Sequence, residues 1–280
     1  MAELEVAAPT SVGYRWYWTL PDYARIARMW VRASMAYPLS FAILTLSSLL
    51  MTGLDFVGIW LIFHSVDSLG GFRLREIALL YAASGFGLGV ADLLIGSVEM
   101  LGQHIRAGTL DVMLLRPMPL LTQVCADRFA PRRIGRITQA VAVFGWGAWG
   151  VAWTPGKVLL AAGMLVGSAV LFFALFVGFS CIQFWTQDGA EFANAFTYGG
   201  NTVTQFPLSI YPRELVRSLT FALPIAFVSW YPGLVLLDRT DPFGMPEWFG
   251  WLTLPVGICC LFVALGLWRL GVRRYTSTGS

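Results

Sequence analysis

Charged side chains are scarce in this chain of 280 residues, since Asp, Glu, Lys and Arg together make up only 12%. A soluble domain usually carries about 25%. Lysine occurs once, at Lys157. So little charge cannot cover the surface of a soluble protein of this size, whereas a hydrophobic content of 57% and a mean hydropathy of +0.66 suit long segments in lipid. The composition therefore indicates an all-α polytopic membrane protein.

Residues that carry catalytic or metal chemistry are also few. The two histidines, His64 and His104, lie 40 positions apart and on opposite sides of the expected membrane topology. The four cysteines are Cys125, Cys181, Cys259 and Cys260. Their spacing matches no metal site, and small buried hydrophobic residues explain them. A membrane-embedded enzyme is therefore the weakest of three functional alternatives.

A nucleotide-binding loop is missing as well. A P-loop requires G-x-x-x-x-G-K-[ST], because its glycine turn exposes amides and its Lys reaches the phosphates. Around Lys157, five residues separate Gly150 from Gly156, and Val158 replaces the Ser or Thr. We therefore expect this chain to bind no cofactor and no metal and to lack ATPase activity. If ATP drives its function, a partner chain must hold the ATP and Mg²⁺.

Long apolar runs predict six membrane spans. Their expected ranges are 38–64, 76–100, 136–154, 157–185, 190–211 and 248–270. Ahead of them, residues 14–36 carry Arg25, Arg28 and Arg32 at helical spacing. This pattern predicts a helix lying in the membrane interface. The alternative is a plain basic flank before the first span.

The region 190–238 is interrupted by four prolines, which are Pro207, Pro212, Pro224 and Pro232. Each proline removes an amide donor and clashes with the preceding turn, so a single helix is excluded. Two full spans would fit the length and would give seven in all. The other possibility is one span over 190–211, followed over 212–238 by short helices that re-enter from the outer face.

The placement of Lys and Arg decides between these topologies. With six spans and a cytoplasmic N-terminus, 13 of the 19 Lys and Arg residues fall on the cytoplasmic side. This distribution obeys the positive-inside rule, whereas a seventh span would move the C-terminal Arg cluster outside. We therefore expect both termini and the loop 104–136 to be cytoplasmic and 212–238 to form a re-entrant hairpin.

One polar segment, His104 to Pro119, reads HIRAGTLDVMLLRPMP and is followed by Gln123. This wording resembles the cytoplasmic loop of ABC transporter permeases of the ABC-2 type. A second stretch, 206–233, reads FPLSIYPRELVRSLTFALPIAFVSWYPG and is similar to the region before the last span in bacterial permeases of that family. The resemblance extends over nearly the whole chain.

The resemblance implies a permease subunit in the cell inner membrane that dimerises with a second copy or with a related permease. It also implies two copies of an ATP-binding cassette ATPase as partners. The expected activity is transport, usually export, of a hydrophobic or amphipathic compound such as a drug, a lipid or a glycolipid. Membrane lipid is an expected partner, and nucleic acid is not. A secondary transporter is the main alternative, although no internal repeat is evident.

In the family, this loop 104–120 carries the short helix that docks on the ATPase. The residues expected to take part here are Arg106, Gly108, Leu110, Asp111, Leu114, Leu115, Arg116 and Pro117. A helix over about 108–115 would offer Leu110, Leu114 and Leu115 to a partner's groove, oriented by charges at its ends. The alternative is a solvated basic loop that only sets topology.

Asp92 is the most conspicuous charge inside an expected span. A charge at the bilayer centre costs about 2.5–3.5 kcal/mol on insertion scales, so it faces protein or water. Asp92 either lines a translocation path that accepts polar or cationic groups, or pairs with a neighbour and fixes packing. Glu99, nearer the inner end of the same span, is expected to reach the headgroup region.

Overall fold

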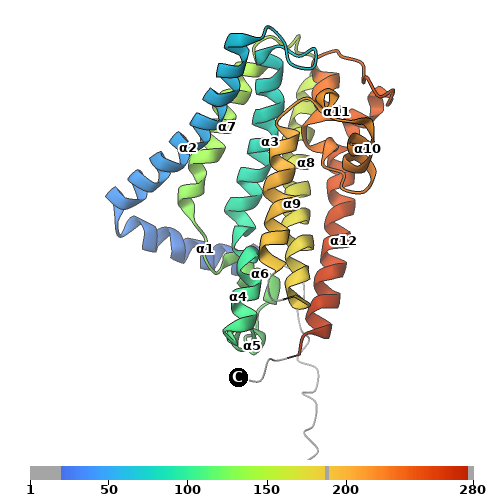
Figure 1. Ribbon diagram of the computed structural model, residues 1–280. Coiled ribbons are helices and arrows are strands. Elements are labelled where there is room, and N and C mark those ends of the chain that lie inside the picture. Colours follow the sequence, from blue (N-terminus) through green and yellow to red (C-terminus); the bar gives the residue numbers. More distant parts are fainter. Residues whose placement is uncertain (1–19, 187–188, 277–280) are drawn as a thin grey trace, which may run out of the picture.

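The computed structural model describes residues 20–186 and 189–276, and over this part the architecture is all-helical (Figure 1). This confirms the expected all-α class. Helices α3, α8, α9 and α12 run roughly along one axis, α2 and α7 are tilted away from it, and α1 lies across it near one end (Figure 1). Residues 14–19 of the expected interfacial helix lie outside the described part.

Within the described residues, four helical segments are long and apolar enough to cross a membrane: Pro38–Ser65, Leu74–Arg106, Pro155–Phe184 and Glu247–Arg274. They are built on α2 (Pro38–Ser65), α3 (Leu74–Ile95), α8 (Pro155–Ser180) and α12 (Thr253–Arg274). Short 3-10 helices extend three of them, namely Gly96–Met100 after α3, Cys181–Phe184 after α8 and Glu247–Leu252 before α12. The chain is therefore a multi-pass membrane protein.

The expected six spans are confirmed only in part, because two of the helices that would form them are short. Helix α7 (Ile134–Ala148) has 15 residues and α9 (Gly189–Thr204) has 16. At 1.5 Å per residue, such helices extend about 22–24 Å, less than the roughly 30 Å of a hydrocarbon core. The span expected over 136–154 ends early, at the turn around Gly150, and the one over 190–211 ends before Pro207.

The proline-rich region is broken, as its sequence suggested. Helices α10 (Arg213–Phe221) and α11 (Ala226–Leu236) meet at 106° and lie at the end of the bundle opposite α5 (Figure 1). Pro207 precedes a 3-10 turn at Leu208–Ile210, Pro212 precedes α10, and Pro224 separates the two helices. Pro232 was also expected to break a helix, but it does not, because it lies inside α11.

Ion pairs hold this same end of the bundle together. The Glu76 carboxylate accepts a hydrogen bond of 2.7 Å from the Arg73 amide at the start of α3. It also pairs with the Arg239 guanidinium through two bonds of 2.8 and 2.9 Å. Since Arg239 follows α11, this bidentate pair ties the re-entrant region to α3.

Helix α1 (Leu20–Met35) packs against the bundle through Tyr23, with the partly buried Ile26 and Ala27 beside it. Tyr23 is buried, and its hydroxyl donates a hydrogen bond of 2.7 Å to the Leu94 carbonyl of α3. Arg25, Arg28 and Arg32 are exposed. An exposed basic face on a helix that lies across the bundle is typical of a helix in the membrane interface.

Helices α3 and α8 form the centre of the bundle. In the most apolar stretch of the segment that contains α3, 78% of the residues are buried, whereas in the corresponding stretch of α2 only 11% are buried. Helix α8 packs along α12, α3 and α11. The largest fully buried side chains include Trp230, Trp268, Phe172 and Phe176. Most of α2 therefore faces away from its own chain.

Contact between α8 and α12 depends on a glycine. A Cβ added at Gly167 would lie 2.7 Å from Thr253 Cγ2 and 2.8 Å from the Leu254 amide nitrogen. Small residues let membrane helices approach closely, and at this position even the Cβ of alanine would be too near the backbone of α12.

Replacing Gly167 by Ala should therefore destabilise the protein by about 1–3 kcal/mol, because the two helices must separate. Gly163→Ala is the matched control on the same helix, since its Cβ would meet nothing within 4 Å. Alanine there should be neutral or should stabilise by up to about 1 kcal/mol. Unfolding in detergent measures both variants, and equal stability of the two would disprove the close-contact role of Gly167.

Candidate functional site

The loop 104–120 folds back through a glycine turn. Helix α4 (Leu101–Arg106) ends two residues before Gly108, whose φ of 66° lies in the left-handed region that favours glycine. Helix α5 (Thr109–Leu114) follows and ends before Pro117. The expected short helix at 108–115 is therefore present, at the end of the bundle away from α10 and α11 (Figure 1).

The apolar side chains that α5 exposes are not the ones expected from its sequence. Leu110 is 0% exposed, so the hypothesis that it docks on a partner is wrong, because its side chain packs in the chain's own core. Leu114 is only partly exposed. The apolar side chains that α5 leaves to solvent are Val112, at 55%, and Leu115, at 87%.

The polar residues around α5 divide in the same way. Arg106, Arg116 and Pro117 are exposed, and Gly108 and Asp111 are half-buried. Burial, and then the nearby Asp111 carboxylate, raise the pKa of Tyr275 just beyond the end of α12. The expected role of Asp111 in orienting α5 on a partner stays a prediction.

Gln123 holds the end of α5 in place. Its side-chain amide donates hydrogen bonds to the carbonyls of Met113, at 2.9 Å, and Met118, at 3.0 Å. It is buried in α6 (Leu120–Ala126). The Met113 carbonyl also accepts backbone hydrogen bonds from Leu115 and Arg116, so Gln123 reinforces the last turn of α5 and ties it to Met118. The sequence contained Gln123 in the resembling loop, but its position ten residues after Met113 did not indicate this contact.

His104 holds the start of α5. Its Nδ1 lies 2.9 Å from the Thr109 hydroxyl, and its Nε2 lies 3.5 Å from an Asp127 carboxylate oxygen. The interaction with His104 is the largest cause that lowers the pKa of Asp127. Two side chains thus fasten α5 to the segment around α6, and a force applied to α5 should move the whole loop.

Asp92 lies in a buried cluster of charges. Its carboxylate pairs with Arg133 at 3.1 Å and with Arg136 at 3.7 Å. The Tyr198 hydroxyl lies 3.4 Å from Asp92 Oδ1 and donates a hydrogen bond of 2.7 Å to Glu99. Glu99 therefore does not extend toward the headgroups as expected, because this bond holds it in the bundle.

This Asp92 cluster joins three elements that are distant in sequence. Asp92 is on α3, Arg133 ends the 3-10 turn Pro131–Arg133 before α7, and Tyr198 is on α9. Two carboxylates and two guanidinium groups balance in charge. Such pairing is the packing alternative for Asp92, and its role in a translocation path stays a prediction.

The sequence did not reveal the partners of Asp92. Arg133 and Arg136 resembled a basic flank, and Tyr198 resembled one more aromatic residue of a span. A buried Asp requires a partner, so the sequence predicted only that a hydroxyl group or an arginine lies near Asp92. Which basic residues reach it depends on how α7 packs on α3, and no single segment encodes that.

Most of the chain matches a known protein family. The family model described as ABC-2 family transporter protein matches residues 49–279. No match emerged among curated proteins or among solved structures. The family consists of membrane transport components, with ATP hydrolysis in a separate subunit. Because the match includes most of the chain, this protein belongs to the ABC-2 transporter family.

Proposed function

We propose that this chain is the transmembrane permease subunit of an ABC exporter and that α5 is the element on which the ATPase acts. Two copies of a separate ATPase would bind a dimer made of this chain and a second copy or a related permease. The cargo would be a hydrophobic or amphipathic compound such as a drug, a lipid or a glycolipid.

The observation that supports this proposal best is the exposed apolar surface of α5. Val112 and Leu115 are exposed to solvent at the end of a membrane bundle, on a helix whose opposite face is buried. Exposed apolar side chains on a rigid element are typical of a partner site. Arg106 and Arg116 flank this surface and suit a partner with acidic groups beside an apolar groove.

The geometry also supports a path for mechanical coupling. Helix α4 continues α3 through the 3-10 turn Gly96–Met100, so the segment Leu74–Arg106 forms one stacked unit. The Asp92 cluster then connects α3 with α7 and α9. A displacement of α5 should therefore tilt α3 together with these two neighbours, which is how closure of an ATPase dimer would reach the membrane.

The topology belongs to the same proposal. The Lys and Arg distribution supports a cytoplasmic location for α5, for both termini and for the loop 104–136. The same Lys and Arg distribution supports six spans. In this arrangement α7 and α9 are short spans, and α10–α11 form a re-entrant pair on the outer side.

Reconstitution tests the proposed function. The purified chain in proteoliposomes, without partners, should hydrolyse no ATP. Co-reconstitution with an ABC ATPase encoded beside it should yield a stable complex and ATP-dependent movement of a fluorescent amphiphile. Transport by the chain alone under a proton or sodium gradient would contradict the proposal and would favour the secondary transporter.

A further inference from the structure

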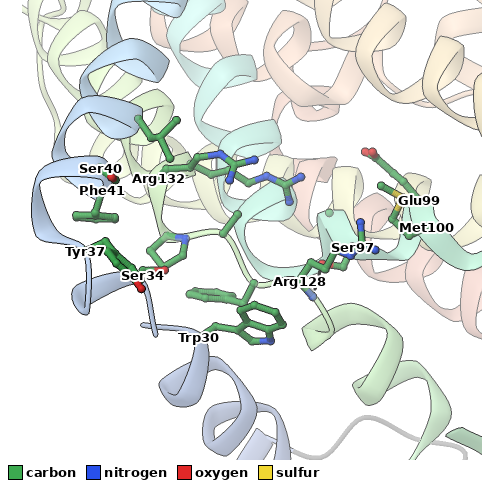
Figure 2. A pocket seen from close by; sticks show the side chains of 16 residues that line it. Trp30, Ser34, Tyr37, Ser40, Phe41, Ser97, Glu99, Met100, Arg128 and Arg132 are labelled. Carbon is green, nitrogen blue, oxygen red and sulfur yellow. Dashed lines mark hydrogen bonds between the residues drawn. The ribbon is translucent and has the colours of Figure 1, made fainter. Parts of the chain in front are cut away.

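A cavity of about 480 Å³ lies between α1, the start of α2 and two short connections, the turn after α3 and the segment before α7 (Figure 2). Its volume is within the roughly 300–1,000 Å³ of small-molecule sites. Neither α5 nor the pairing of Asp92 requires a hollow at this place. Its walls combine arginine, serine and aromatic side chains (Figure 2).

The cavity lies at the boundary between lipid and water. Helix α1 lies across the bundle near the end that carries α5 (Figure 1), and residues of α1 and of the start of the tilted helix α2 line the cavity. The Lys and Arg distribution assigns this end to the cytoplasm. A ligand here would therefore meet the headgroup layer of the inner leaflet.

Positive charge dominates one wall of the cavity, which Arg128, Arg132 and Arg133 line. Arg133 is engaged by Asp92. Arg128 is 60% exposed, with Asp127 at 3.9 Å. Among the described residues, no carboxylate oxygen lies within 4 Å of the Arg132 guanidinium. The Arg132 guanidinium thus borders the cavity without a carboxylate partner among the described residues, and the exposed Arg128 has only the long 3.9 Å ion pair with Asp127.

The other charges near the cavity do not cancel this excess. Glu99 is the one acidic residue in its wall, and its carboxylate accepts the hydrogen bond from Tyr198 of α9. The first turn of α2 contributes Ser40 and Phe41, and no side chain caps that helix. The uncapped amides and the helix dipole add to the attraction for an anion.

The remaining wall is apolar and continuous with the lipid-facing side of α2. Trp30, Phe41 and Leu44 line it, and Leu44 is 48% exposed on α2. The indole nitrogen of Trp30 is buried, and no described residue accepts its hydrogen bond. An oxygen-rich ligand with an apolar tail would satisfy both the basic wall and this one, whereas free phosphate would leave the apolar wall uncovered.

We infer that this cavity binds the phosphate-bearing headgroup of an anionic lipid of the inner leaflet, with Arg128 and Arg132 on the phosphate and the acyl chains along α2. The inference rests on the topology given in the proposed function, and it does not depend on the proposed coupling of α5 to an ATPase.

Native mass spectrometry of the purified chain in detergent tests this inference. Phosphatidylglycerol should bind more tightly than phosphatidylcholine. The double variant Arg128→Gln/Arg132→Gln should weaken phosphatidylglycerol binding about 25-fold, which corresponds to about 1 kcal/mol for each arginine. Binding of phosphatidylcholine should be unchanged. Both side chains are exposed, so the variant should fold normally, and its unfolding temperature verifies this.

The matched control is Arg28→Gln/Arg32→Gln, which removes two exposed arginines from α1 that do not line the cavity. It should change binding less than about twofold, since surface charge alone is weak and screened. Equal losses of phosphatidylglycerol binding in both double variants would show that the lipid is attracted by the basic surface in general and not by this cavity. Equal binding of the two lipids would overturn headgroup recognition. Displacement of the lipid by excess inorganic phosphate would identify free phosphate as the occupant and overturn the lipid assignment.

Discussion

Replacing Asp92 by Asn should lower the free energy of unfolding by about 2–4 kcal/mol. The substitution leaves Arg133 and Arg136 without their shared carboxylate, and breaking a buried pair usually costs about 3–5 kcal/mol. The loss of stability should lie at or below the low end of that usual cost, because the two arginines can reach solvent. Their side chains are 25% and 30% exposed, whereas that of Asp92 is 7% exposed. Unfolding of the purified chain by denaturant in detergent measures the effect.

Glu247→Gln is the matched control for Asp92→Asn, since it removes one carboxylate from an exposed position. Its effect should stay within about 0.5 kcal/mol. Adding Arg133→Gln to Asp92→Asn should cost less than the sum of the two single changes, because the pair is already broken. If Asp92→Asn kept full stability but abolished transport, the translocation path would be supported and the packing role would be wrong.

Val112→Ala with Leu115→Ala should weaken ATPase binding roughly a hundredfold and reduce export accordingly. Each truncation of an apolar anchor at an interface costs about 1–2 kcal/mol, and 1.4 kcal/mol corresponds to tenfold. Both side chains are exposed in the isolated chain, at 55% and 87%, so folding should be unaffected. The measurement is the affinity of the reconstituted ATPase, together with ATP-dependent export.

Val158→Ala with Leu159→Ala is the matched control for this pair. These two apolar side chains on α8 are exposed to similar degrees, at 56% and 66%, and lie in its first turn, away from α5. They should leave ATPase affinity unchanged. Leu110→Ala should instead destabilise the loop, by about 2–5 kcal/mol, because it removes a fully buried side chain. Undiminished ATPase binding by the Val112/Leu115 variant would make α5 a topology anchor only.

Thr122 illustrates why sequence position is a poor guide to a neutral control. It follows Pro117 and Pro119, beyond the end of α5 in the sequence, yet it is fully buried in α6. A substitution there would disturb the packing that holds Gln123 against Met113. The exposed pair on α8 avoids this difficulty.

The sequence by itself determined the membrane class, the all-α architecture and the family. Low charge and long apolar runs require lipid as the solvent, whatever the tertiary packing is. It also located the break in 212–238 and the short helix near 108–115, because prolines and glycines act within a few residues of their own position. These signals are local and can be read from one segment.

The tertiary structure alone decided which face of each helix is buried. The apolar strip of α5 contained Leu110, Leu114 and Leu115 in sequence, but packing buried Leu110 and left Val112 and Leu115 exposed. The partners of Asp92 and the basic cavity beside α1 arise where segments distant in the chain meet. A helical period describes one helix, whereas burial and ion pairing depend on the neighbour that packs against it, and this is why they emerged only from the fold.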